Sequence, residues 1–173
     1  MSRKLSAVIS WVCLVILVLV PIFGMGYLIR IESFAAFVQG SIGLPIQWST
    51  VSNAQWYGLW VITAVFVSIG LVGLYFLRRA FVNFAKGEFF NTSNSRDIRR
   101  FSILLLAQAL ATPLHITLSS LLLSANHPAG QKMLSIAFGS NELKAIGVAL
   151  VLWVLSDLLV QACHLDAENK QFV

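Results

Sequence analysis

Two rows of polar side chains, set in otherwise apolar stretches, are the residues most able to do chemistry. In each row the positions are i, i+4, i+7 and i+11, a spacing that places side chains on one face of an α-helix. The first row comprises Gln108, Thr112, His115 and Ser119, and the second comprises Asp157, Gln161, His164 and Glu168. Because polar groups in hydrocarbon are costly unless paired, both rows are expected to face the protein interior.

Asp157 and His115 are the candidates for proton transfer or for lining an ion path, since an ionisable residue within a membrane span suggests function. The alternative is structural: Asp157 pairs with Gln108, Gln161 or an arginine of the connector, and His115 is neutral and hydrogen-bonded. At about 1.5 Å per residue, Gln108 and Asp157 would both lie roughly 10 Å inside the inner membrane boundary. The two side chains are therefore predicted to be neighbours.

Motifs for metal, cofactor or catalytic chemistry are not found. His164, Asp166 and Glu168 are ligand-type residues, but positions two apart do not share a helical face, and there is no His-Glu-x-x-His motif. The Gly-x-Ser-x-Gly nucleophile motif and the Gly-x-x-x-x-Gly-Lys phosphate loop are also missing from the sequence. We expect no metal site, no cofactor and no enzymatic activity.

The elements that carry these residues are those of a membrane protein. Of its 173 residues 58% are hydrophobic and 11% are charged, against about a quarter charged in soluble domains. Four apolar stretches have about the length that a helix needs to cross a bilayer. The sequence predicts an all-α integral membrane four-helix bundle in a single domain, with helices at about 7–29, 56–85, 95–124 and 143–166.

Prolines and long outer segments add detail to this fold. Pro21 in the first helix and Pro113 in the third each remove a backbone donor and clash with the preceding turn, which predicts kinks at both positions. The outer segments 30–55 and 125–142 are longer than simple turns, and long loops on compact proteins are often functional. A small apolar or amphipathic ligand could bind between these segments and the kinked third helix.

The distribution of Lys and Arg predicts the orientation. With the N-terminus inside, the two tails and the connector with the helix ends that flank it hold nine of these residues. The outer segments and the outer end of the fourth helix hold three. The positive-inside rule then places both termini in the cytosol.

The connector, at about 86–95, lies in the only long polar and basic segment of the chain. The candidate contact residues there and in the C-terminal tail are Arg78, Arg79, Lys86, Phe89, Phe90, Arg96, Arg99, Arg100 and Glu168. Anionic headgroups attract each basic residue near the surface by roughly 1 kcal/mol, so membrane lipid alone would explain the basic residues. The Phe89-Phe90 pair either returns to the membrane interface or anchors a protein partner.

Two stretches carry a resemblance to a known family. They are Phe84-Ala85-Lys86-Gly87-Glu88-Phe89-Phe90, followed by Asn94 and Arg99-Arg100, and Leu165-Asp166-Ala167-Glu168-Asn169 with a chain end at Phe172-Val173. In these stretches the chain resembles a bacterial membrane family catalogued as domain of unknown function 2975. The resemblance implies a small four-helix inner-membrane protein with no established activity, often encoded beside a helix-turn-helix transcription regulator.

Two functions are compatible with these features. The first is a non-enzymatic regulatory or sensory protein of the inner membrane, which contacts a cytosolic partner through the basic connector and the C-terminal tail. A helix-turn-helix regulator is the partner that the resemblance implies, and direct contact with nucleic acid is not expected. The alternative is a small oligomeric transporter or channel, with a polar path around Asp157 and His115; self-association is possible in either case.

Overall fold

The computed structural model describes residues 3–29, 35, 39–40, 46, 48–89, 91–128, 132 and 134–169. The elements are α1 (Arg3–Ile29), the short 3-10 helix η1 (Trp48–Thr50), α3 (Asn53–Lys86), α4 (Thr92–Ser124) and α5 (Ser140–Asn169). Strands are not found in these ranges. Helices α1, α3, α4 and α5 are each long and apolar enough to cross a membrane. The predicted all-α four-helix membrane fold is confirmed.

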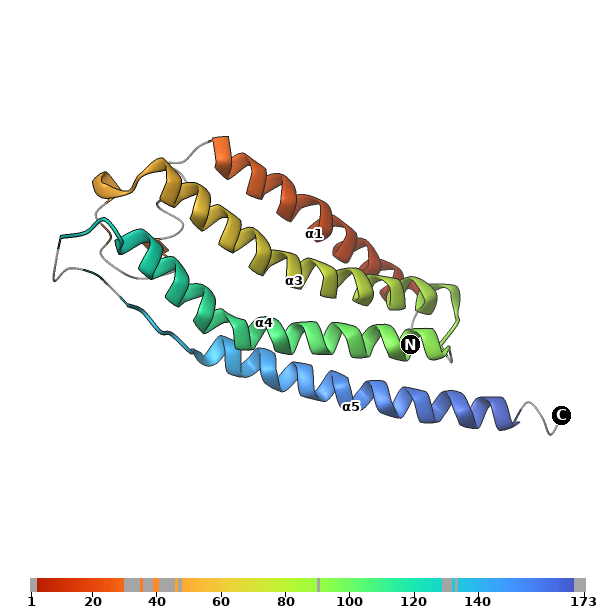
Figure 1. The fold of residues 1–173 in the computed structure, drawn as a ribbon. Coiled ribbons are helices and arrows are strands. Elements are labelled where there is room, and N and C mark those ends of the chain that lie inside the picture. The colour runs from red at the N-terminus through yellow and green to blue at the C-terminus, as the bar shows by residue number, and fades with distance from the viewer. Residues whose placement is uncertain are drawn as a thin grey trace.

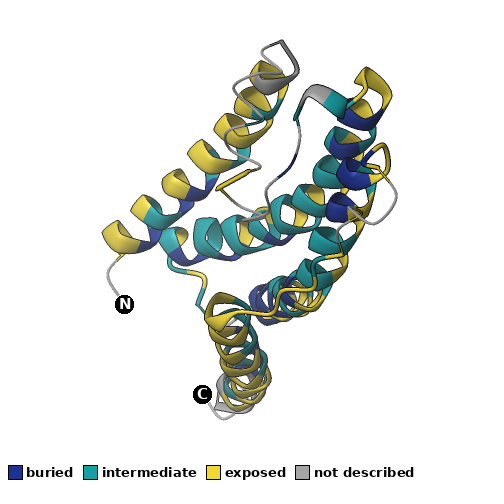
Figure 2. Cartoon of the chain, turned by 90° about the vertical axis from the view of Figure 1, so that its left-hand side faces the viewer, coloured by how far each residue is buried: buried dark blue, intermediate teal, exposed yellow. Residues whose placement is uncertain are grey.

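The long helices lie side by side in chain order (Figure 1). Helix α1 packs on α3, α3 on α4, and α4 on α5, whereas other helix pairs share no extensive interface within the residues described. The bundle is therefore an open row. Helices α1 and α5, at the two ends of the row, carry much exposed surface (Figure 2).

Local capping sets the ends of α3 and α4. Ser52 starts α3 with a capping box, because its hydroxyl accepts from the Gln55 N–H while its own N–H donates to Oε1 of Gln55 at 2.8 Å. Gly87 ends the same helix in the left-handed region, with φ 92°. Asn91 starts α4 by accepting a bond from the Ser93 N–H at 2.9 Å. The connector between the helices therefore spans 87–91, shorter than the predicted 86–95.

The helices α1 and α4 continue without interruption through Pro21 and Pro113. The kinks at these positions stay predictions.

Helix α5 is displaced along α4 toward the connector. In the extended segment before α5, the Ser135 N–H donates to Oγ of Ser120 at 3.1 Å, and the Ser135 carbonyl accepts from Oγ1 of Thr117 at 3.1 Å. These bonds hold the segment along the flank of α4. Helix α5 then begins opposite the middle of α4, and its last turns extend past the start of α4 (Figure 1).

Two buried clusters lie at opposite ends of the α3–α4 hairpin. At the end near Thr50 and Asn126, here called the loop end, the cluster comprises Ile46, Trp56, Leu59 and Leu123. At the end near Gly87, here called the connector end, it comprises Ala80, Phe84 and Ile98. Both clusters join α3 to α4, so this hairpin is the centre of the fold.

Candidate functional site

An ion pair between α3 and α4 lies at the connector end. Nε of Arg79 donates to Oδ2 of Asp97 at 2.6 Å, and Nη2 donates to Oδ1 at 2.9 Å. The Asp97 side chain is fully buried, whereas that of Arg79 is 43% exposed. Such a two-point contact between guanidinium and carboxylate fixes the relative position of both groups. The pair therefore ties the last turns of α3 to the second turn of α4.

Two asparagines form a second link across the connector. Nδ2 of Asn83 donates to Oδ1 of Asn94 at 2.7 Å, and Nδ2 of Asn94 donates to the Glu88 carbonyl at 2.6 Å. Asn94 is almost fully buried. The Glu88 carbonyl of the turn thus has a partner within the protein, which helps to order the turn.

The first turn of α1 completes the connector end. A Cβ atom built on Gly87 would lie 2.7 Å from Nη2 of Arg3, so the Arg3 guanidinium packs directly against this glycine. Both its left-handed φ and this close approach favour glycine at position 87. The connector end therefore brings together α1, α3 and α4.

Besides Arg3 and Arg79, four further basic residues near this turn are exposed, and we call them the basic surface: Lys86, Arg96, Arg99 and Arg100. The Arg99 guanidinium lies 5.5 Å from the ring centroid of Trp153 in α5, and that of Arg100 lies 5.1 Å from the ring centroid of Phe76. Cation–π contacts of this length orient the guanidinium groups without neutralising them. Arg99 also lies 3.8 Å from Asp157 and Arg100 lies 3.9 Å from Asp97, so the positive charge of the basic surface is partly compensated.

The remaining predicted contact residues differ in their surroundings. Arg79 is occupied by Asp97, and Arg78 is half-buried, with a buried Nε that makes no hydrogen bond to any described residue. Phe89 packs on the connector-end cluster and stacks on Phe84 with ring centroids 5.9 Å apart. Phe89 thus returns to the protein. Phe90 and the side chain of Glu168 lie outside the described residues.

The first polar row lies along α4, in contact with α3. Oε1 of Gln108 would be 2.7 Å from a Cβ on Gly70, so the amide lies against the glycine, and the Thr112 hydroxyl donates to the Gln108 carbonyl at 3.1 Å. Nε2 of His115 lies 3.2 Å from Oγ1 of Thr63. The hydrogen-bonded arrangement of His115 that the structural alternative expected is therefore present.

His115 also stacks on the ring of Phe66, with centroids 4.7 Å apart. Ser119, the last member of this row, is fully buried, and its hydroxyl has no partner among the described residues.

The second polar row does not meet the first, and the prediction that Gln108 and Asp157 are neighbours is wrong. Asp157 is exposed, and its nearest ion-pair partner is Arg99, with Nη1 at 3.8 Å from Oδ1. Gln161 and His164 are exposed as well. The cause is the displacement of α5, because Gln108 lies nine residues beyond Arg99, about 13 Å along the helix.

The same displacement separates Asp157 from His115. His115 lies sixteen residues beyond Arg99 in α4, about 24 Å along the helix. The polar path that the transport alternative expected around these two side chains is therefore not assembled within one chain. Asp157 instead pairs with Arg99, an arginine of the connector region, as the structural alternative expected.

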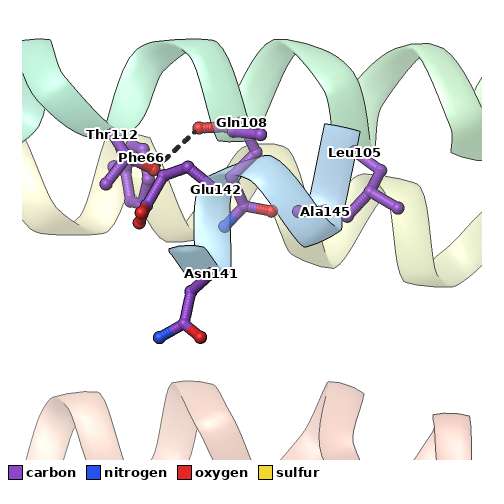
Figure 3. Close-up of a pocket in the computed structure, with 8 residues that line it drawn as sticks. Phe66, Leu105, Gln108, Thr112, Asn141, Glu142 and Ala145 are labelled. Carbon is purple, nitrogen blue, oxygen red and sulfur yellow. Dashed lines mark hydrogen bonds between the residues drawn. The ribbon is translucent and has the colours of Figure 1, made fainter. Parts of the chain in front are cut away.

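A cavity of about 170 Å³ lies where the first turns of α5 cross α3 and α4 (Figure 3). Its walls include Phe66, Gln108, Thr112, Glu142 and Ala145. Glu142 was not among the predicted site residues, because the sequence places it at the outer end of a span. Within the described ranges, no three His, Cys, Asp or Glu side chains are grouped closely enough to hold a metal ion.

The ion-pair partner Asp97 was also not predicted as a site residue. Asp97 and Glu88 are the two acidic residues among the basic residues of segment 77–101. The available signal was that a carboxylate in this segment has several possible arginine partners.

These features define the class: a small, multi-pass, all-α membrane protein whose α3–α4 connector is locked by buried polar contacts. Comparison with known families gives the particular assignment. Residues 44–173 match the family described as protein of unknown function (DUF2975), and the chain belongs to this family. No curated protein and no solved structure gives a significant match.

Proposed function

We propose that this chain is a non-enzymatic regulatory or sensory membrane protein whose connector end contacts a cytosolic partner. The observation that carries the proposal is the bidentate Arg79–Asp97 pair beside an exposed basic surface. Membrane lipid would attract basic residues on a loose turn equally well, so lipid binding alone gives no reason for locking the turn. A protein partner does, because prior order lowers the entropy cost of binding.

The charge distribution supports an orientation with the connector end and both termini in the cytosol of a bacterial inner membrane. Nine of the twelve Lys and Arg residues lie in the tails and the connector region. In this orientation the basic surface faces the cytosol at the level of the anionic headgroups.

The proposed partner is an acidic surface of a cytosolic protein. Arginine forms two-point contacts with carboxylates, and charge complementarity of this kind speeds association and selects partners. A helix-turn-helix regulator is the class of partner that the family resemblance implied. Its DNA-binding face would remain free, since the membrane protein is proposed to contact the protein and not the nucleic acid.

The proposal can be tested by crosslinking and mass spectrometry in native membranes at physiological salt. Wild type is compared with an Arg96→Ala/Arg99→Ala/Arg100→Ala variant, and with a Lys132→Ala/Lys144→Ala control that removes exposed charge at and beyond the cavity. We expect a cytosolic protein to crosslink to wild type and to the control, and to be lost from the arginine variant. Self-contacts alone in all three, with equal amounts in the membrane, would refute a protein partner at this surface.

A further inference from the structure

The cavity between α3, α4 and α5 lies beside the middle of α4 and the first turn of α5, within segments apolar enough to cross a membrane. Gln108 and Thr112, which line it, lie near the middle of α4 (Thr92–Ser124), and α5 reaches this level with its first turns. The Glu142 carboxylate therefore lies beside the middle of the apolar stretch of α4. A charged carboxylate at such a depth is costly unless a positive group or several hydrogen bonds compensate it.

The protein itself compensates Glu142 only in part. Oε2 of Glu142 accepts a bond from the Gly139 N–H at 2.8 Å, which is half of a capping box at the start of α5. The helix dipole there adds a partial positive charge, smaller than the full charge of the carboxylate. In the part of the chain that the structure describes, no Lys, Arg or His forms an ion pair with this carboxylate.

The other walls of the cavity offer an acceptor and an aromatic face. The Gln108 side-chain amide makes no hydrogen bond to any described residue, although it lies firmly against Gly70. Phe66 contributes a ring, and Ala145 is small enough to leave the space open. Figure 3 shows that these groups come from three helices and that the Glu142 side chain extends toward Thr112 and Phe66, whereas the Asn141 side chain points away from them.

We propose that this cavity binds a small organic cation. Its ammonium group would pair with the Glu142 carboxylate and donate to Oε1 of Gln108, while its apolar body packs on the ring of Phe66. Aromatic rings attract organic cations, whereas hard metal ions require about six oxygen ligands. The cavity of about 170 Å³ is similar in size to an engineered cavity of about 150 Å³ that holds benzene, so one ring with an ammonium group is the expected size.

The role of this cation as a signal rests on the proposed sensory function, whereas its binding to the cavity can be measured separately. The full chain is placed in phosphatidylcholine nanodiscs at neutral pH and titrated with benzylammonium chloride. Benzyl alcohol serves as a neutral analogue and sodium chloride as a salt control. The midpoint of thermal unfolding, followed by tryptophan fluorescence, reports binding.

We expect benzylammonium to raise the unfolding midpoint of wild type saturably, and Glu142→Gln to weaken binding at least tenfold. Glutamine keeps an oxygen for the Gly139 N–H, so the start of α5 is preserved in this variant. Ala145→Leu should also abolish binding, because it fills the cavity while the carboxylate remains. Glu88→Gln, which removes an exposed carboxylate outside the cavity, should bind as wild type does.

Three results would overturn the inference: equal binding by Glu142→Gln, an equal effect of benzyl alcohol, or the same shift with sodium chloride alone. Absence of any saturable shift in folded wild type would do so as well. None of these results bears on partner capture by the basic surface, and loss of the partner crosslink would leave the titration unaffected. The two proposals therefore fail independently.

Discussion

Nη1 of Arg99 lies 3.8 Å from Oδ1 of Asp157, and this pair marks the level at which α5 passes the first turns of α4. Both side chains are 52% exposed, so the contact is a surface ion pair. The same guanidinium lies over Trp153, one helical turn earlier in α5. Arg99 therefore contacts α5 twice, through the ion pair with Asp157 and through the cation–π contact with Trp153.

Replacement of Asp157 by Asn is expected to have little effect on stability. Exposed ion pairs contribute about 0.5 kcal/mol, and the contact of Arg99 with Trp153 is retained. The measurement is the free energy of unfolding in detergent micelles, with wild type as reference. A loss of several kcal/mol would mean that Asp157 is buried in the membrane-embedded protein, for example by a second copy of the chain.

Replacement of Arg79 by Met is expected to lower the unfolding midpoint far more than replacement of Arg96 by Met. The first change leaves the fully buried Asp97 carboxylate with Arg100, at 3.9 Å, as its one remaining ion-pair partner among the described residues. A poorly paired buried charge is strongly destabilising. Arg96 is exposed and serves as a matched control. Equal midpoints for the two variants would contradict a structural role for the Arg79–Asp97 pair.

Gly87→Ala is expected to cost about 1–2 kcal/mol, because an L-residue is strained at a left-handed φ. The added Cβ must also displace the Arg3 guanidinium from its position 2.7 Å away. Gly147→Ala is the control, since nothing lies within 4 Å of its Cβ position in α5, and alanine favours a helix by about 1 kcal/mol. Thermal unfolding should move in opposite directions for the two variants.

Gly70→Ala is expected to destabilise the α3–α4 interface, because its Cβ would lie 2.7 Å from Oε1 of Gln108. Shortening the neighbour in a Gly70→Ala/Gln108→Ala double variant should recover part of the loss. Residues in direct contact show coupling free energies of about 0.5–3 kcal/mol in a double-mutant cycle. Strict additivity of the two single changes would show that the amide does not lie on Gly70 in the membrane.

The number of helices and the inward face of the first polar row could be predicted from the sequence. The inward face expected for the second row is wrong, because Asp157, Gln161 and His164 are exposed, and the axial offset between helices could not be predicted. Residues at i, i+4, i+7 and i+11 share one face of a helix, so their spacing predicts which side of the helix is polar. The spacing does not predict how far one helix is shifted along its axis relative to its neighbour. The offset of α5 depends on Ser135, whose two bonds to α4 hold an extended segment that hydropathy alone counts as an outer loop. Gln108 and Asp157 were therefore placed at the same depth incorrectly.

The polar contacts of the connector end escaped prediction for a different reason. Arg79 and Asp97 are eighteen residues apart and belong to different helices, so no helical spacing relates them. Only the tight turn at Gly87 and the cap at Asn91 bring the two side chains together. Without the positions of the helix ends, the sequence does not distinguish charged residues that pair across the two helices from those that face lipid headgroups.

The open row of helices has a consequence for biosynthesis. Since each long helix packs on the one that precedes it in the chain, every helix that leaves the ribosome finds its docking surface already in the membrane. In a closed bundle the first helix also packs on the last, so that interface forms only after the last helix has been synthesised. Assembly one helix at a time keeps contacts short in sequence, which favours rapid folding, and a chain interrupted before α5 would still contain a complete set of α1–α3 and α3–α4 interfaces.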